Sequence, residues 1–361
     1  MAVTVEQVLD ALRKVNDPEI HKDLVTLGMV KDVRVDGARV EFTVELTTPA
    51  CPLKAQIQSE AEQAVRAVPG VGDVAISFSA QVRNPVSASS LPGIRNTVAI
   101  GSGKGGVGKS TVAANLALAL AAEGARVGLL DADIYGPSIP LMLGVENERP
   151  TGEGQTIHPV EAHGIKVMSI GFMLPRSEDP VIWRGPMLGN VLTQFLRQVA
   201  WGELDYLLID LPPGTGDIPL TLVQTIPLSG AAIVITPERV ATQIGTKTLR
   251  MFQGDRTNVP ILGIIENMAA FECPHCHETT EIFDGGGGEA LADKEGVPFL
   301  GRLPLDPRIR KGGDEGKPIV LAEPDSALAR SFHEIARKMA GRLSVEYFRV
   351  EQPLVVGFPV I

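Results

Sequence analysis

The sequence predicts an α/β fold in which a small α+β domain precedes a doubly wound, mostly parallel sheet. The chain has 361 residues, which is more than one typical domain contains. From Asn96 onward, short apolar runs without polar alternation recur between helical stretches, a pattern typical of strands buried on both faces. Before that point, apolar and polar residues alternate on both sides of Asp36-Gly37, which indicates a hairpin.

Residues 1–85 are expected to form the small α+β domain. Its expected elements are helices over 4–15 and 51–68 and strands over 29–35, 38–46 and 72–82. Residues 84–92 are rich in serine and proline and lack an apolar period, so we place a linker at 86–94.

Residues 95–361 are expected to form the second domain. Its expected strands lie within 96–100, 125–133, 165–170, 204–210, 230–236 and 260–268. Helical stretches separate most of these strands, and this alternation predicts a doubly wound α/β domain.

A glycine-rich loop stands between the first of these strands and an expected amphipathic helix at 110–124. Gly103-x4-Gly108-Lys109-Ser110 matches the phosphate-loop pattern, in which backbone N–H groups wrap phosphates. We expect Lys109 to bridge the β- and γ-phosphates and the Ser110 hydroxyl to ligate Mg²⁺. The loop residues expected at the nucleotide are Gly103, Lys104, Gly105, Gly106, Val107, Gly108, Lys109, Ser110 and Thr111. The alternative interpretation is a glycine-rich turn before a helix.

Three aspartates follow expected strands. Asp210 precedes a loop of proline and glycine and fits a Walker-B role, which holds the Mg²⁺ shell. Asp131 and Asp133 lie two residues apart, so on a strand they would point the same way. We expect one of them to assist Mg²⁺ and the other to orient the attacking water. Alternatively, both cap the loop.

Composition argues against nucleic acid and membranes as partners. The net charge of −10 would repel phosphate backbones, and aromatic residues make up only 4% of the chain. The N-terminal segment lacks the basic start and apolar run of a signal peptide. The C-terminal segment, EQPLVVGFPVI, has two prolines and no basic face. We therefore expect a cytoplasmic protein.

A pair of cysteines, Cys273 and Cys276, has the C-x-x-C spacing that grips one metal ion or one edge of a cluster. Structural zinc sites and [4Fe–4S] clusters usually take four ligands, and the remaining cysteine, Cys51, lies in the other domain. Two chains related by a twofold axis would supply four thiolates. A zinc site with His275 and His277, or a redox dithiol, are the other interpretations.

The motifs together resemble a known family. The loop GKGGVGKST resembles the deviant Walker A of the nitrogenase-iron-protein, MinD and ParA class. With DADIYGPSIP, LLIDLPPGTGD, ENM and FECPHCHETTEIFDGGGG, residues 95–340 resemble the Mrp/ApbC family of iron–sulfur cluster carrier ATPases. DPEIHKDLVTLGMV and TTPACP resemble the small iron–sulfur-assembly domain often fused to bacterial members.

This resemblance implies roles for single residues. Lys104 would reach across a dimer interface to the partner's nucleotide, and a cation there stabilises transition-state charge. Asp133 would activate water, with Asp131 and Asp217 nearer the metal and the switch loops. Asn267 would recognise the adenine edge, where its amide offers both a donor and an acceptor. Pro304 is expected to pack on the adenine base. The glycines at 285–288 are expected to let the cluster loop open and close.

The resemblance implies a homodimeric ATPase with slow turnover, which carries a [4Fe–4S] cluster at its interface and passes it to apo-proteins alongside cluster-assembly proteins. A partitioning ATPase, a zinc-stabilised adaptor and an ATP-driven electron donor are the alternatives. Cys51 stands at an expected helix start, where the dipole lowers the pKa of a thiol. A transient cluster contact and a small buried apolar residue are both open interpretations of it.

Overall fold

The computed structural model describes residues 3–83, 91–154, 156–173, 185–273, 275–283 and 285–351. The chain divides into two compact units, Met1–Pro85 with Ala340–Ile361 and Val86–Met339. We describe them separately as the small unit and the large unit.

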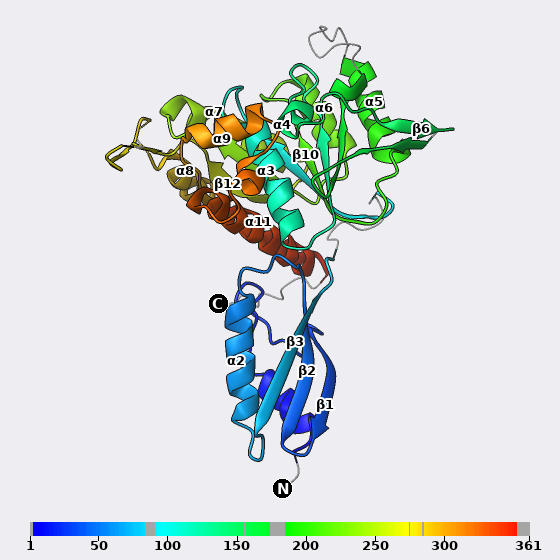
Figure 1. The fold of residues 1–361 in the computed structure, drawn as a ribbon, viewed down its shortest axis with the longest axis vertical. Coiled ribbons are helices and arrows are strands. Elements are labelled where there is room, and N and C mark those ends of the chain that lie inside the picture. The colour runs from blue at the N-terminus through cyan, green and yellow to red at the C-terminus, as the bar shows by residue number, and fades with distance from the viewer. Residues whose placement is uncertain are drawn as a thin grey trace, which may run out of the picture. The chain divides into compact units, whose positions relative to one another are not determined.

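The small unit is a three-stranded sheet with two helices packed on it (Figure 1). Its elements are α1 (Val5–Leu12), β1 (Val30–Asp36), β2 (Arg39–Leu46), α2 (Lys54–Arg66) and β3 (Asp73–Ala80). β1 and β2 form the expected antiparallel hairpin, and Gly37 takes the left-handed conformation (φ 60°) that its turn requires. β3 pairs in parallel with β2, and α2 makes the crossover between them.

The apolar residues of the small unit that recur at strand or helix spacing form its core. Alternate residues of β2 are buried from Val40 to Leu46, and α2 buries Ile57, Ala61 and Val65 at helical spacing. Phe348, from the C-terminal end of the chain, belongs to the same core with 6% exposure. The last helix therefore contributes to the small unit from Ala340 onward, whereas the sequence placed all of 95–361 in the second domain.

The large unit contains an eight-stranded sheet in the order β15-β12-β11-β4-β10-β5-β9-β8. Its main strands are β4 (Ile94–Gly101), β5 (Val127–Asp131), β8 (Val160–Ala162), β9 (Ile165–Ser169), β10 (Leu204–Asp210), β11 (Gly230–Ile235), β12 (Ile261–Glu266) and β15 (Phe299–Arg302). β8 runs antiparallel to β9, and the other neighbours pair in parallel. The doubly wound, mostly parallel sheet that the sequence predicts is confirmed.

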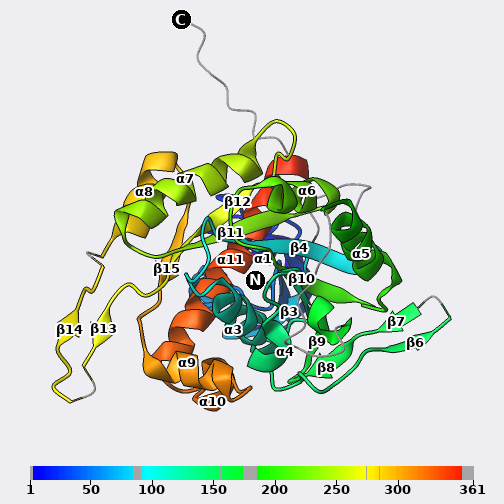
Figure 2. The ribbon, with the colours of Figure 1, turned by 90° about the horizontal axis from the view of Figure 1, so that it is seen from above.

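Short hairpins and helices complete the large unit. The hairpin strands are β6 (Thr151–Glu153) with β7 (Thr156–His158), and β13 (Phe271–Glu272) with β14 (Thr279–Thr280). The helices are α3 (Lys109–Ala122), α4 (Ile139–Met142), η1 (Ile170–Met173), α5 (Gly185–Gln198), α6 (Asp217–Thr225), α7 (Arg239–Gln253), α8 (Gly287–Glu295), α9 (Pro307–Asp314), α10 (Ile319–Ala322) and α11 (Ala327–Glu351). In Figure 2, α5, α6 and α7 lie on one side of the sheet and α3 and α4 on the other.

Helix α3 is not amphipathic, contrary to the expectation. Its residues from Val112 to Leu120 are all buried, because it also contacts α4, α9 and α10 on the side away from the sheet. Asn115, buried within α3, donates to Thr111 O and accepts from the N–H of Val320 at the start of α10. The phosphate loop therefore leads into a helix that is held on every side.

The order of the strands indicates where a ligand would bind, at the carboxyl end of the central strand β4. β4 lies in the middle of the sheet, between β10 and β11, and the loop after it carries the phosphate pattern. In parallel sheets, ligands bind outside the carboxyl ends of the strands, where successive connections leave in different directions. Within the described part of the chain, no helix is both long enough and apolar enough to cross a membrane.

Candidate nucleotide site and cysteine finger

The phosphate loop runs from Ser102 to Thr111 and lines a cavity of about 200 Å³ that Asp133, Ser138 and Met142 also reach. Gly108 has a φ of 81°, which favours glycine, and a Cβ added there would lie 2.3 Å from Asn267 Nδ2. Helix α3 begins at Lys109, and none of the described side chains caps its first turn. Its N–H groups and its dipole are thus available to phosphate oxygens.

Charged and hydroxyl groups converge beside this loop. Lys109 Nζ lies 2.7 Å from Asp210 Oδ1 and 3.6 Å from Asp133 Oδ2. The Ser110 hydroxyl donates to Asp210 Oδ2 at 2.5 Å. Asp133 Oδ1 is buried and lacks a hydrogen-bond partner among the described residues. These oxygens are the hard donors that Mg²⁺ prefers, so the residues fit the expected metal.

Asp131 lies deeper than its neighbours and holds the loop that follows β5. Its carboxylate is fully buried and accepts from the N–H groups of Asp133 and Ile139 and from the Ser169 hydroxyl at 3.0 to 3.2 Å. Burial and the nearby Asp210 raise the pKa of Asp131 to about 8. Burial also raises the pKa of Asp210, against the opposing effect of Lys109. This use of both oxygens favours the loop-capping interpretation of Asp131.

Lys104 forms an ion pair within its own chain, with the carboxylate of Glu238. Glu238 is the N-cap residue of α7 and lies three residues after Ile235, the last residue of the strand β11. Although burial acts to raise it, the hydrogen bond from Lys104 holds the pKa of Glu238 below its ordinary value. Glu238 was not among the residues expected at the site; the available signal was an acidic residue shortly after a buried parallel strand.

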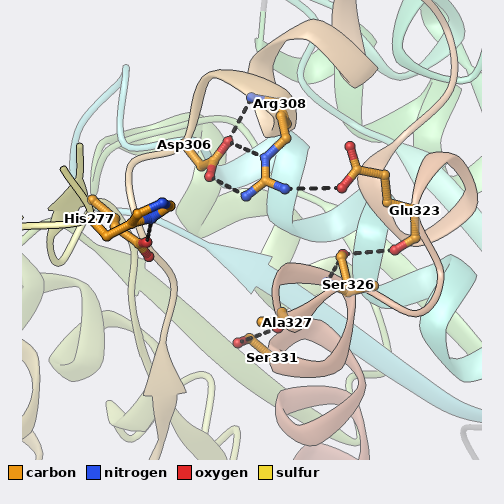
Figure 3. A network of polar contacts seen from close by, with 9 residues as sticks. His277, Asp306, Arg308, Glu323, Ser326, Ala327 and Ser331 are labelled. Carbon is orange, nitrogen blue, oxygen red and sulfur yellow. Dashed lines mark hydrogen bonds and ion pairs between the residues drawn. The ribbon is translucent and has the colours of Figure 1, made fainter. Parts of the chain in front are cut away.

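Asn267 follows β12 and contacts the phosphate loop, where its Nδ2 donates to Val107 O at 2.8 Å. Pro304 is half-buried in the segment after β15, between two residues that hydrogen-bond to Ala269 and Ala270. The same segment continues into Asp306, which caps α9 and pairs with Arg308, itself paired with Glu323 (Figure 3). The contact of Asn267 and Pro304 with adenine stays a prediction, as does the place of Asp217, which is exposed in the first turn of α6.

The cysteine pair lies at the tip of a short hairpin, residues 268–285, which we call the cysteine finger. β13 and β14 pair Phe271 with Thr280 and Glu272 with Thr279, and the finger extends away from the sheet in Figure 2. At the tip, Cys273 N donates to Glu278 O, and His277 N donates to Cys273 O. Cys276 is exposed and Cys273 half-exposed.

The surroundings of Cys273 favour a thiolate. The backbone N–H of Cys276, then that of His275, lowers the pKa of Cys273. His277 Nδ1 lies 2.8 Å from Glu272 Oε1, so this ring nitrogen is already engaged (Figure 3 shows His277). Among the described residues, no three histidine, cysteine, aspartate or glutamate side chains come together as a metal site. The finger thus presents two thiol ligands at its surface.

Part of the glycine run at 285–288, which was expected to let the cluster loop open and close, belongs to helix α8. Gly287 and Gly288 are the first residues of α8, and Gly286 is its cap. A Cβ on Gly287 would lie 2.2 Å from Pro237 O, and one on Gly288 would lie 2.8 Å from the Cβ of Glu266. These glycines are required because α8 packs closely against the ends of two strands.

Cys51 also differs from the expectation. α2 begins at Lys54, with Leu53 as its cap, so the thiol lies outside the first turn. Cys51 packs against the core of the small unit, and burial raises its pKa to about 11. The expected thiolate is therefore wrong, and the structure favours a small, partly buried residue packed against the core.

Two family models match this chain, one in the large unit and one in the small unit. The model described as "NUBPL iron-transfer P-loop NTPase" matches residues 93–340. The model described as "Iron-sulfur cluster assembly protein" matches residues 5–78.

Curated relatives match almost the whole chain. An iron–sulfur cluster carrier protein of Deinococcus radiodurans is 48% identical over 94% of this chain and 96% of its own length. The iron–sulfur cluster carrier protein of Synechocystis is 47% identical over 95% of this chain and 99% of its own length.

Solved structures resemble the large unit. A nucleotide-binding protein of Archaeoglobus fulgidus, in complex with ADP, has a TM-score of 0.58 and 43% identity, covering 65% of this chain and 91% of that one. The cell division ATPase MinD of Pyrococcus furiosus has a TM-score of 0.51 and 25% identity, covering 67% of this chain and 97% of that one. The resemblance found in the sequence is confirmed: the chain belongs to the family of iron-transfer P-loop NTPases, with an iron–sulfur cluster assembly domain at its N-terminus.

Proposed function

We propose that the chain is an ATP-dependent iron–sulfur cluster carrier, which binds a [4Fe–4S] cluster between two copies and transfers it to apo-proteins. The single observation that carries this proposal is the exposed pair Cys273 and Cys276 at the tip of the finger. Its relatives of nearly equal length are named iron–sulfur cluster carrier proteins.

The number of ligands supports a shared cluster. A [4Fe–4S] cluster takes about four protein thiolates, and one finger supplies Cys273 and Cys276. Cys51, the remaining cysteine, lies in the small unit, where it is partly buried against the core and is not part of the finger. A second finger related by a twofold axis supplies the missing pair, because a symmetric contact repeats each residue.

The nucleotide site supports ATP turnover. Lys109 is placed to exchange Asp210 for the β- and γ-phosphates, and Ser110 with Asp210 offers oxygen ligands to Mg²⁺. Asp133 orients the attacking water, and its buried Oδ1, which has no hydrogen-bond partner among the described residues, supports this role. The Archaeoglobus relative holds ADP on the same fold.

Lys104 supports control of this turnover by the dimer. Its pairing with Glu238 keeps the ammonium in its own chain, where it neutralises a partly buried carboxylate. If Lys104 moves to the partner's γ-phosphate, it adds a cation where charge develops. ATP then biases the dimer between two geometries, and cluster release follows the nucleotide state.

Anaerobic reconstitution with iron and sulfide tests the cluster proposal. We expect about four iron and four sulfide per two chains, with the absorbance of a [4Fe–4S] cluster. Cys273→Ser and Cys276→Ser are each expected to lose it. Cys51→Ser is the matched control and is expected to retain the full cluster, since its thiol is partly buried against the core of the other unit.

Two results would overturn the proposal. Unchanged iron and absorbance in both finger variants would show that the cysteine pair does not hold the cluster. One zinc per chain after anaerobic purification, with no exchange for iron, would indicate the zinc-stabilised adaptor instead.

A further inference from the structure

The cysteine finger begins and ends beside the carboxyl end of β12. It leaves β12 through Asn267 and Met268 and returns into α8 at Gly287. The N–H groups of Gly286 and Gly288 both donate to the carboxylate of Glu266, the last residue of β12. One side chain thus joins the two ends of the finger.

The carboxylate of Glu266 is fully buried, with 0% exposure. Oε1 lies 3.2 Å from Gly286 N and 3.3 Å from Arg302 Nε, and Oε2 accepts from Gly288 N. It also stands at the N-terminus of α8, where free N–H groups and the helix dipole favour a negative charge. A buried carboxylate is stable only while such partners remain, so this contact holds the finger's base firmly.

Asn267, the next residue, connects the same point to the phosphate loop. Consecutive residues at the end of a strand point to opposite faces, so Glu266 contacts α8 while Asn267 contacts Val107 and Gly108. The Asn267 side chain lies too close to Gly108 for any Cβ at that position. This contact and the hydrogen bond to Val107 O couple the position of Asn267 to that of the phosphate loop.

Backbone hydrogen bonds tie the segment with Pro304 into the same junction. Leu303 N donates to Glu266 O at 2.8 Å, and Ala269 N donates to Leu303 O at 2.9 Å. Leu305 N then donates to Ala270 O at 2.8 Å. The segment expected beside the adenine is therefore hydrogen-bonded to the first residues of the finger.

We propose that Glu266 is a positioning residue, which fixes the base of the cysteine finger to the nucleotide site so that nucleotide occupancy sets the position of Cys273 and Cys276. This inference rests on the proposed function, since it assigns the route by which ATP acts on the cluster ligands. Glu266 is not among the described residues that line the cavity at the phosphate loop. It acts through α8, Arg302 and the adjoining Asn267.

Thiol labelling of the cluster-free protein tests this without any cluster or turnover. The labelling rates of Cys273 and Cys276 by a maleimide are measured by peptide mass spectrometry, with and without ADP. We expect ADP to slow both rates about fivefold in the natural chain, the lower end of typical coupling between two sites. In Glu266→Gln we expect a ratio near one, because the amide NH₂ faces one of the two N–H donors and frees one end of the finger.

The contacts of Arg302 suggest a variant with a partial effect, Arg302→Gln, and a control variant, Glu289→Gln. Arg302 pairs with Glu266 and also with the exposed Glu289. Glu289→Gln removes only the surface partner and is expected to keep the fivefold response. Arg302→Gln weakens the buried contact while leaving Glu266 charged, and is expected to give about a twofold response. It also keeps the inference testable if Glu266→Gln fails to fold.

Binding of a fluorescent ADP analogue separates positioning from general damage. We expect its Kd to change less than about twofold in Glu266→Gln, because Glu266 lies outside the cavity at the phosphate loop. A full ADP response in Glu266→Gln and Arg302→Gln, or none in the natural chain, would overturn the inference. Neither result bears on cluster binding, so the inference and the carrier function fail by different measurements.

Discussion

Lys104 and Glu238, which lie 134 positions apart in the sequence, form an ion pair at the edge of the phosphate loop. The side chains are 35% and 29% exposed, so the pair is partly shielded from water. A lysine expected to serve a partner chain is therefore held in its own chain. In the proposed dimer, Glu238 would compete with the partner's phosphates for this ammonium and would so oppose the dimeric state.

Glu238→Gln is predicted to release Lys104 from this ion pair. A partly exposed ion pair contributes about 1 kcal/mol, so losing it is expected to raise ATP turnover about fivefold when the protein is dilute. Turnover is measured as phosphate release across a range of protein concentrations. Lys104→Ala is expected to lose the concentration dependence altogether. Glu334→Gln, an exposed change on α11, is the control, and a rise of equal size there would contradict the explanation.

The sequence predicted well what depends on local pattern. The apolar runs form strands β4, β5, β9, β10, β11 and β12, because short apolar runs without polar alternation suit strands that are buried on both faces of a parallel sheet. It could not predict contacts between distant segments. Glu238 and Glu266 are ordinary acidic residues in the sequence, and only the strand order brings them to Lys104 and to α8.

The expectations that differ from the structure also concern contacts between segments that are distant in the sequence. A run of alanine and leucine with a few polar residues was interpreted as an amphipathic helix, yet α3 is covered on both sides by elements that follow much later in the chain. The glycines at 285–288 indicate a hinge in the sequence, yet two of them, Gly287 and Gly288, lie within α8, where close packing explains them. Cys51 was placed at a helix start three residues before the helix begins, where burial instead of the dipole sets its pKa.

Lys109→Ala is predicted to destabilise the large unit as well as to abolish nucleotide binding. Lys109 has 5% side-chain exposure and is paired with the fully buried Asp210, so its removal leaves a carboxylate without a cation. Breaking such a pair costs about 3 kcal/mol of unfolding free energy. The measurement is urea unfolding of the nucleotide-free protein. The double variant Lys109→Ala with Asp210→Asn is expected to recover most of the loss, and a failure to recover would show that the charge is not the cause.

Asp131 is predicted to make stability fall as the pH rises. Its pKa is about 8 when folded and 3.8 in a model peptide, so between these values the folded state holds one more proton than the unfolded state. Its contribution is fully present below about pH 4 and is lost as the pH passes through about 8. Between these limits, the unfolding free energy is expected to decrease by up to about 1.4 kcal/mol per pH unit from this group.

Urea unfolding at a series of pH values checks this slope. Asp131→Asn is expected to be less stable overall, since its amide cannot accept from all three donors, but to show a flatter dependence on pH. Asp255→Asn, an exposed change in the same unit, is expected to keep the slope. A slope that is equal in both variants would assign the effect to other groups.

The three cysteines are predicted to react in a fixed order that follows their surroundings. Backbone N–H groups lower the pKa of Cys273, whereas burial raises that of Cys51 to about 11. Because the thiolate is the nucleophile, iodoacetamide at neutral pH is expected to modify Cys273 first and Cys51 last. Labelling of Cys51 should increase only as the pH approaches about 11, while Cys273 is already labelled at neutral pH. Peptide mass spectrometry over this range checks the order, with urea-unfolded protein as the control in which the three rates converge. Early labelling of Cys51 in the folded protein would restore the case for a thiolate in the small unit, and with it a direct role for that unit in handling iron.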